Sequence, residues 1–104
     1  VSNTDDHLRN HGFLLSHKGW RLSPAYDINP IVGRQGLHLN ITDNSNALDY
    51  SLAFEVIGFF RLSKEEATNI YDQVLAAVKT WKSTATKLGV NRAEQLLKQE
   101  AFNV

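Results

Sequence analysis

Residues 3–30 read NTDDHLRNHGFLLSHKGWRLSPAYDINP, and this stretch decides the fold of the first half of the chain. Two apolar-rich runs lie in its middle, at residues 13–15 and 20–22, with four small or polar residues between them. Short runs of this kind, joined by a connection that contains a glycine, predict a β-hairpin in which Gly19 takes a positive φ.

The chain after this hairpin is predicted to extend and turn. Pro24 and Pro30 disfavour a helix here, because proline has no amide hydrogen to donate and biases the residue before it toward extended backbone. Residues 37–41 then alternate apolar and polar side chains, which is the pattern of a half-buried strand. We therefore predict a small β layer over residues 11–41.

The second half of the chain has helical periodicity. Residues 48–60 are apolar almost all round, which predicts a largely buried helix. Ser63 and Glu66 have the spacing of a capping box, and apolar residues then recur every three or four positions as far as Gly89. Asn91 begins a third, short helix. The predicted fold class is α+β, a short hairpin and strand layer followed by three helices.

Composition narrows the class of protein. A chain of 104 residues with 42% hydrophobic and 21% charged residues is expected to fold as one domain. Its 11 basic and 11 acidic residues balance, which argues against autonomous binding to nucleic acid or to an anionic membrane. Without cysteine there is no disulfide or thiolate-metal site, and no apolar run approaches the roughly 20 residues of a membrane span. A cytoplasmic protein is expected.

The order of three polar residues points to a chemistry. A polar loop with an Asp-Asp pair usually only turns the chain or caps a helix. Here, however, four residues separate Asp5 from Asn10, and the predicted hairpin then separates Asn10 from Asp27. Phosphoryl transfer in the kinase fold uses this order: the first Asp accepts or orients the proton of the attacking hydroxyl, and the Asn and second Asp hold Mg²⁺ against the nucleotide phosphates. Amide and carboxylate oxygens are suitable ligands for Mg²⁺.

These residues resemble the HipA-like serine/threonine-protein kinase family, the toxin component of bacterial toxin–antitoxin pairs. Its catalytic loop has the form D-x-H-x-K-N, and its metal-binding segment reads L-x-P-x-Y-D. The resemblance implies that Asp5 is the catalytic aspartate and that Asn10 and Asp27 are the Mg²⁺ ligands, with ATP as co-substrate.

Three further residues match the family and are expected to support the site. His7 stands at the family's histidine, and we favour a structural role, in which its ring hydrogen-bonds a backbone carbonyl or a carboxylate, over an acid–base role. Arg9 stands where the family more often has Lys, a change that keeps the charge but not the geometry. Tyr26, and Trp20 on the hairpin, are expected to be core aromatics and not base-stacking platforms.

The match covers residues 3–30, and the helical remainder fits part of the C-terminal lobe of a protein-kinase-like fold by pattern alone. The chain has no methionine and begins inside a motif, and it shows neither a phosphate-covering loop nor an upstream lysine for the α- and β-phosphates. We therefore expect a partial domain whose N-terminal portion is absent. Residues 1–46 would carry the catalytic loop, hairpin and metal-binding segment, residues 47–104 would be helical, and the isolated fragment would be inactive.

The resemblance implies transfer of the γ-phosphoryl group of ATP to a protein hydroxyl. Aminoacyl-tRNA synthetases are characteristic targets of such toxins, and a DNA-binding antitoxin is the implied partner. Two alternatives stay open. One is a small-molecule or lipid phosphotransferase of kinase-like fold, which residues 22–27 make less favoured. The other is a non-catalytic helical module that binds an antitoxin, against which the intact Asp5, Asn10 and Asp27 argue.

Overall fold

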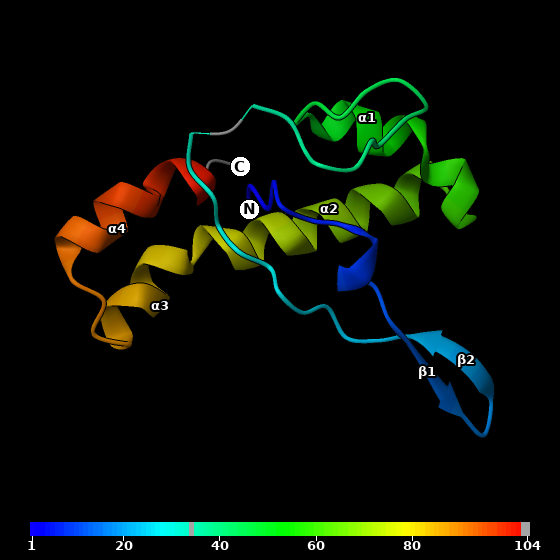
Figure 1. Ribbon diagram of the computed structural model, residues 1–104, viewed down its shortest axis with the longest axis horizontal. Helices are drawn as coiled ribbons and strands as arrows, with labels where there is room; N and C mark the ends of the chain where they lie inside the picture. The colour runs from blue at the N-terminus through cyan, green and yellow to red at the C-terminus, as the bar shows by residue number, and fades with distance from the viewer. Residues whose placement is uncertain (34, 103–104) are drawn as a thin grey trace.

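The computed structural model describes residues 1–33 and 35–102, and it places a β-hairpin with irregular segments beside a layer of helices (Figure 1). The elements in chain order are the 3-10 helix η1 (Leu8–Asn10), strands β1 (Phe13–Ser16) and β2 (Gly19–Leu22), helix α1 (Tyr50–Glu55), the 3-10 helix η2 (Ile57–Phe60), helices α2 (Lys64–Lys79), α3 (Trp81–Lys87) and α4 (Arg92–Lys98), and the 3-10 helix η3 (Gln99–Phe102). The predicted α+β class is confirmed. The number of α-helices within the described residues is four, not three.

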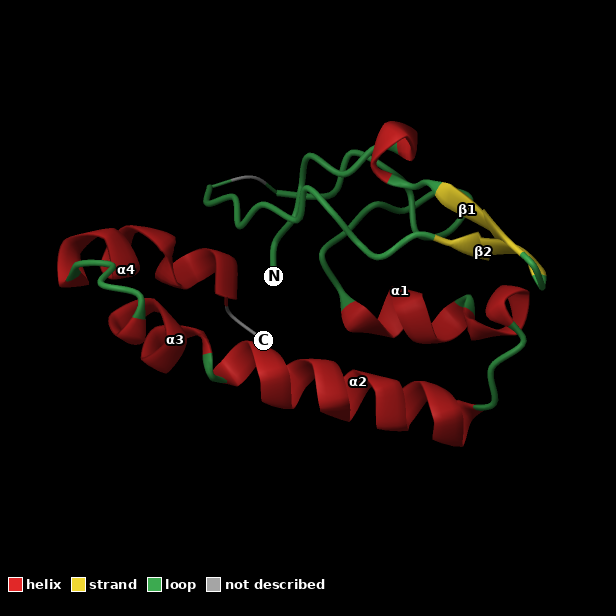
Figure 2. Ribbon diagram, turned by 90° about the horizontal axis from the view of Figure 1, so that it is seen from below, coloured by secondary structure: helices red, strands yellow, loops and turns green. Residues whose placement is uncertain are grey.

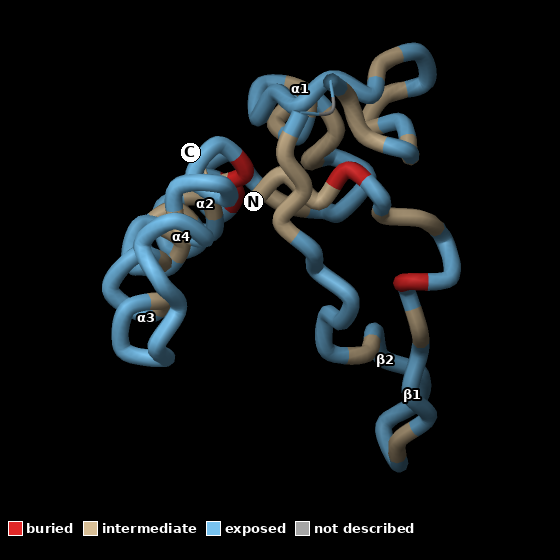
Figure 3. Tube along the Cα trace, turned by 60° about the vertical axis from the view of Figure 1, so that its left-hand side comes forward, coloured by how far each residue is buried: buried red, intermediate tan, exposed pale blue. Residues whose placement is uncertain are grey.

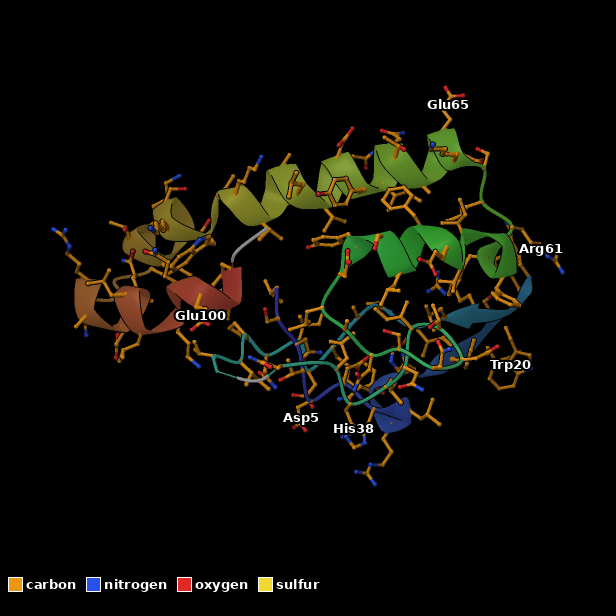
Figure 4. The ribbon with its side chains drawn as sticks, turned by 90° about the horizontal axis from the view of Figure 1, so that it is seen from above. Asp5, Trp20, His38, Arg61, Glu65 and Glu100 are labelled. Atoms are coloured by element: carbon orange, nitrogen blue, oxygen red, sulfur yellow. The ribbon has the colours of Figure 1, made fainter. Side chains whose placement is uncertain are left out.

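The predicted hairpin is confirmed, including the positive φ of Gly19, which is 103°. Phe13 pairs with Leu22 and Leu15 with Trp20, so these four apolar side chains share one face of the two-stranded sheet. That face is open, since each of the four side chains is more than 60% exposed. Figure 4 shows Trp20 projecting away from the body of the molecule, so its predicted core position is wrong.

The predicted strand at residues 37–41 is wrong. The backbone here bonds to nearby turns instead, with the Leu37 N–H donating to the Asn46 carbonyl at 2.7 Å and the Ile41 N–H to the Ser45 carbonyl at 2.8 Å. Burial still alternates along the segment as its sequence suggested. The alternating pattern therefore predicted correctly that every second side chain is half-buried. However, the segment does not pair with the sheet of the hairpin, which consists of the two strands β1 and β2.

The predicted helix at 48–60 is shorter than expected and is not largely buried. The Asp49 carboxylate caps α1 by accepting the Ser51 N–H at 2.8 Å, α1 ends at Glu55, and η2 follows. Phe59 is 88% exposed and Phe60 70%. Helix α1 lies beside α2 (Figure 2), and Tyr50 meets Tyr71 edge-on with ring centroids 5.0 Å apart. An apolar pattern all round a helix needs partners on every side, and within the described residues α1 has too few.

The long second helix is divided at Thr80. Its start is as predicted, because the Ser63 hydroxyl and the Glu66 carboxylate form a reciprocal capping box. The Thr80 hydroxyl donates to the Ala77 carbonyl at 2.8 Å, the kind of side-chain bond that bends helices, and α3 begins at the next residue. Gly89 (φ 79°) ends α3 as predicted.

The buried core is small. Among the described residues the buried apolar side chains are Ala67 and Ala101, and the buried polar ones are Thr4 and Asn10 (Figure 3). The two ends of the described chain lie close together, because the Ser2 N–H donates to the Ala101 carbonyl at 2.8 Å. No described helix combines the length and apolar character needed to cross a membrane.

Candidate functional site

The loop before the hairpin fixes the side chain of Asn10. Its last three residues form η1, and the Asn10 N–H donates to the His7 carbonyl at 2.8 Å. The Asn10 amide oxygen accepts the His7 N–H at 3.2 Å in return. Asn10 is buried, and the bond from the His7 N–H holds its side-chain amide in a defined orientation, while the backbone bond closes the turn of the loop.

The segment after the hairpin is drawn back onto this loop. The Ser23 N–H donates to the Gly12 carbonyl at 2.8 Å, which continues the pairing of β1 with β2 by one step. The Tyr26 hydroxyl then donates to the Arg9 carbonyl at 2.7 Å. Tyr26 is 46% exposed, so its predicted core position is wrong, and its contribution comes from this hydrogen bond between the two segments.

Asn10 and Asp27 meet where these two segments join. The Asn10 Nδ2 donates to the Asp27 Oδ2 at 2.7 Å, although the residues are 17 positions apart. The second carboxylate oxygen of Asp27 accepts the Asn29 Nδ2, also at 2.7 Å. Asp27 has a φ of 56°, in the left-handed region that few non-glycine residues occupy, and such positions cluster at functional sites.

Asp5 lies on the same loop, five positions before Asn10, and its side chain is exposed (Figure 4). The hydrogen bonds of the Asp27 carboxylate within the described residues are to Asn10 and Asn29, and none is to Asp5. The two predicted metal ligands, Asn10 and Asp27, are therefore hydrogen-bonded to each other. The predicted catalytic aspartate, Asp5, lies in the same loop as Asn10 and is open to solvent.

Two of the expected supporting residues, His7 and Arg9, make the following contacts. The His7 ring nitrogen Nδ1 is buried and has no hydrogen-bond partner among the described residues, so the bond expected from it to a carbonyl or carboxylate is not found there. The His7 ring instead lies edge-on to the His38 ring, with centroids 6.5 Å apart. Arg9 contributes its backbone carbonyl and has an exposed side chain.

Two contacts of the site were not foreseen. Asp6, to which the sequence assigns no role, accepts a hydrogen bond from the His11 ring at 3.0 Å on the exposed side of the loop. Asn29 contacts Asp27, and the only signal for it in the sequence is a carboxamide placed two residues after the predicted metal-binding aspartate. Asx side chains commonly bond to groups two residues away in turns, so this spacing could have indicated the contact.

The donor set fits a hard divalent cation in its chemistry. Oxygens of one amide and one carboxylate are ligands that Mg²⁺ accepts, with water and phosphate filling the remaining positions. Each oxygen here accepts one hydrogen bond and keeps a further acceptor site. However, Asn10 turns its nitrogen, not its oxygen, toward Asp27. Within the described residues no group of three or more His, Cys, Asp or Glu side chains could hold a metal.

Two apolar grooves lie elsewhere on the molecule. One runs between the end of α2, α3 and α4, and the other lies between α1, η2, α2 and residues 40–43. Neither is lined by Asp5, Asn10 or Asp27. The polar site is therefore separate from the apolar concavities of the helical layer.

Comparison of the sequence with protein-family models identifies the family of this chain. Residues 1–82 match the model of the HipA-like C-terminal domain family. The match covers most of the chain and includes every residue of the site, so the protein belongs to the HipA-like C-terminal domain family. No curated protein and no solved structure matches the chain.

Proposed function

We propose that this chain forms the catalytic-loop and metal-binding part of an ATP- and Mg²⁺-dependent serine/threonine-protein kinase of the HipA-like toxin type. The observation that carries the proposal is the 2.7 Å contact between Asn10 and Asp27. In this chemistry both residues would bind the same ion. The contact brings them together although the predicted hairpin separates them in the sequence. Membership of the HipA-like family supports the same reading.

The proposed roles follow from position and exposure. The Asp5 carboxylate takes the proton of an acceptor hydroxyl, whose oxygen forms a bond to the γ-phosphorus of ATP while the bond from that phosphorus to the bridging oxygen of ADP breaks. Its exposure leaves room for a protein side chain to approach. Asn10 and Asp27 would hold Mg²⁺, which when bound neutralises charge on the phosphates. The His7 N–H orients the Asn10 amide for that task.

The proposal extends to the partners that the family implies. The acceptor is a protein hydroxyl, with aminoacyl-tRNA synthetases as the substrate class, and the regulatory partner is a DNA-binding antitoxin. The chain has a net charge of zero, so contact with DNA would be made by the antitoxin and not by this chain.

One observation favours a second function. Phe59 and Phe60 at the end of η2 are largely exposed, and surface of this kind often contacts another protein. A helical module that binds an antitoxin without catalysis would use this surface and would not need Asp5. A small-molecule or lipid phosphotransferase would need all three polar residues, and the choice of acceptor separates it from the protein kinase.

Two substitutions in the complete protein test the proposal. Asp5→Asn is expected to lower phosphoryl transfer by about 10²- to 10⁴-fold, the range for loss of a general base, and to leave ATP binding nearly intact. Asp27→Ala is expected to weaken Mg²⁺-dependent ATP binding and transfer together, because it removes the charged ligand of the ion. Asp72→Asn, on the exposed side of α2, is the matched control. Transfer to an aminoacyl-tRNA synthetase and ATP titrations are the measurements, and wild-type transfer by Asp5→Asn would exclude the catalytic role of Asp5.

A further inference from the structure

We propose that Asn29 is a positioning residue that holds the Asp27 carboxylate in place for a divalent cation, an inference that rests on the proposed function for the identity of the ion. The Asn29 Nδ2 donates to the Asp27 Oδ1 at 2.7 Å, while the Asn10 Nδ2 donates to the Oδ2 at the same distance. A carboxylate turns freely about its last bond, since that torsion has broad preferences. Two donors, one on each oxygen and from different segments, remove this freedom.

Asn29 is itself fixed by the stretch that precedes the catalytic loop. Its backbone N–H donates to the Asn3 Oδ1 at 3.2 Å, and the Ile31 N–H donates to the Ser2 carbonyl at 3.0 Å. Ser2 is in turn bonded through its own N–H to the Ala101 carbonyl at the C-terminal end of the described chain. The Asn29 donor is therefore anchored to residues 2–3, which lead directly into the loop that carries Asp5.

The backbone of Asp27 explains why such an anchor is needed. A φ of 56° is unfavourable for a residue with a Cβ, although Asp tolerates it better than most, and it persists where surrounding contacts determine it. The Asn29 side chain also reaches the Asp27 carbonyl, at 3.5 Å, so it contacts both the backbone and the carboxylate of this residue. The short turn at residues 27–29 thus contains its own support.

Asn10 and Asn29 have different tasks in this scheme. Asn10 turns its nitrogen toward Asp27, so sharing one cation with Asp27 would require its amide oxygen to face the ion instead. Asn29 need not change, since its bond occupies one acceptor site of Oδ1 and leaves the others free. Partners of this outer kind orient a ligand without touching the ion, and their loss typically lowers metal affinity by about 10- to 100-fold.

The test compares three variants by nuclear magnetic resonance. Asn29→Ala removes the side chain, Asn29→Asp keeps its size but removes the donor, and Asn69→Ala on the exposed surface of α2 is the control. The side-chain NH₂ signals of Asn10 report on its bond to Asp27. Without cation, we expect both Asn29 variants to move these signals toward those of a solvated amide, while Asn69→Ala leaves them unchanged.

A titration with Mn²⁺, used as a paramagnetic probe in place of Mg²⁺, gives the second readout. Asn29→Ala is expected to bind about tenfold more weakly than the wild-type chain. If the Asn10 signals are unchanged in Asn29→Asp, the donor of Asn29 has no effect and the side chain only fills space, which contradicts the inference. Unchanged signals in both Asn29 variants would also overturn it. If Mn²⁺ fails to broaden signals around Asp27 in the wild-type chain, the proposed metal site is wrong, while the cation-free signals still decide the positioning role.

Discussion

Replacing Asn10 with aspartate tests the geometry of the site through stability alone. The Asn10 side chain makes two bonds, accepting the His7 N–H at 3.2 Å and donating to Asp27 at 2.7 Å. In Asn10→Asp the first bond survives, because a carboxylate oxygen still accepts the N–H. The second bond is replaced by two carboxylates facing each other, which repel at neutral pH.

The expected cost follows from charge and distance. Two unit charges about 4 Å apart interact with about 1 kcal/mol in water and about 4 kcal/mol at the effective dielectric constant near a protein surface. Asn10 is buried and Asp27 exposed, so we take an intermediate repulsion of about 2 kcal/mol. A loss of 1 kcal/mol lowers the Tm of a domain of this size by about 4–8 °C, so we expect a fall of roughly 10 °C.

A divalent cation reverses the sign of this effect, because it binds two carboxylates better than one carboxylate and an amide. Circular dichroism melts in EDTA and in excess Mg²⁺ measure it. In Mg²⁺ we expect the Tm of Asn10→Asp to return most of the way to the wild-type value. Asn10→Ala has neither an amide nor a carboxylate, and its Tm is expected to stay below the wild-type value in both buffers. The reasoning would be refuted by Asn10→Asp melting with the wild type in EDTA, or by Mg²⁺ raising the Tm of both variants equally.

Two further predictions concern the helical layer. Hydrogen bonds from the Ser63 backbone N–H, and then from its hydroxyl, lower the pKa of Glu66 from its ordinary value of 4.5, so the contribution of this cap to stability is present above pH 4.5 and is lost as the pH falls through the lowered pKa. A pH titration of helicity should show this loss in the wild type and not in Glu66→Gln. Gly89→Ala places a Cβ at φ 79°, where it meets nothing within 4 Å, so the backbone alone should cost about 1–2 kcal/mol. Gly58→Ala, also open but with no positive φ, is the control in urea unfolding and should be neutral or better.

The features that the sequence predicted correctly are those set by neighbouring residues. The hairpin needs two short apolar runs and Gly19, and the start of α2 needs Ser63 and Glu66 three residues apart. Gly89 ends α3 because its backbone adopts a conformation that other residues resist, and the Val90 N–H then reaches back to the Ala85 carbonyl at 3.0 Å. Each signal acts within a few positions of the chain, so no knowledge of the tertiary fold is needed to read it.

The errors have a common cause, because each depends on contacts that a local pattern does not contain. A strand at residues 37–41 requires an adjacent strand edge, and this segment lies against turns and against Thr4 instead. The apolar residues of 48–60 indicate burial, but burial requires neighbours on every side. The division at Thr80 depends on which hydrogen bond its hydroxyl makes, and a threonine within a helical pattern is compatible with either outcome.

For the site, the order of residues predicted which side chains matter but not how they face one another. Asp5, Asn10 and Asp27 were identified from spacing, and the hairpin brings the latter two together as that spacing implied. The orientation of the Asn10 amide depends on the His7 N–H, and the support from Asn29 depends on the left-handed turn at Asp27. Neither follows from residue types alone.

The site is held together by hydrogen bonds more than by the burial of apolar side chains, so a bound cation would add to its stability. The apolar face of the hairpin is open, and the segment after the hairpin is joined to the loop by hydrogen bonds, among them those of Tyr26 to Arg9 and of Asn10 to Asp27. Hydrogen bonds of this kind each contribute only about 1 kcal/mol net, and somewhat more when one partner is charged. A cation bound only by the folded site would stabilise it by RT ln(1 + c/Kd), where c is the concentration of free cation, which is about 2.7 kcal/mol when c is about 100 times Kd. For the proposed cation, metal affinity and local stability would therefore be linked, and the change of one amide to a carboxylate is expected to alter both.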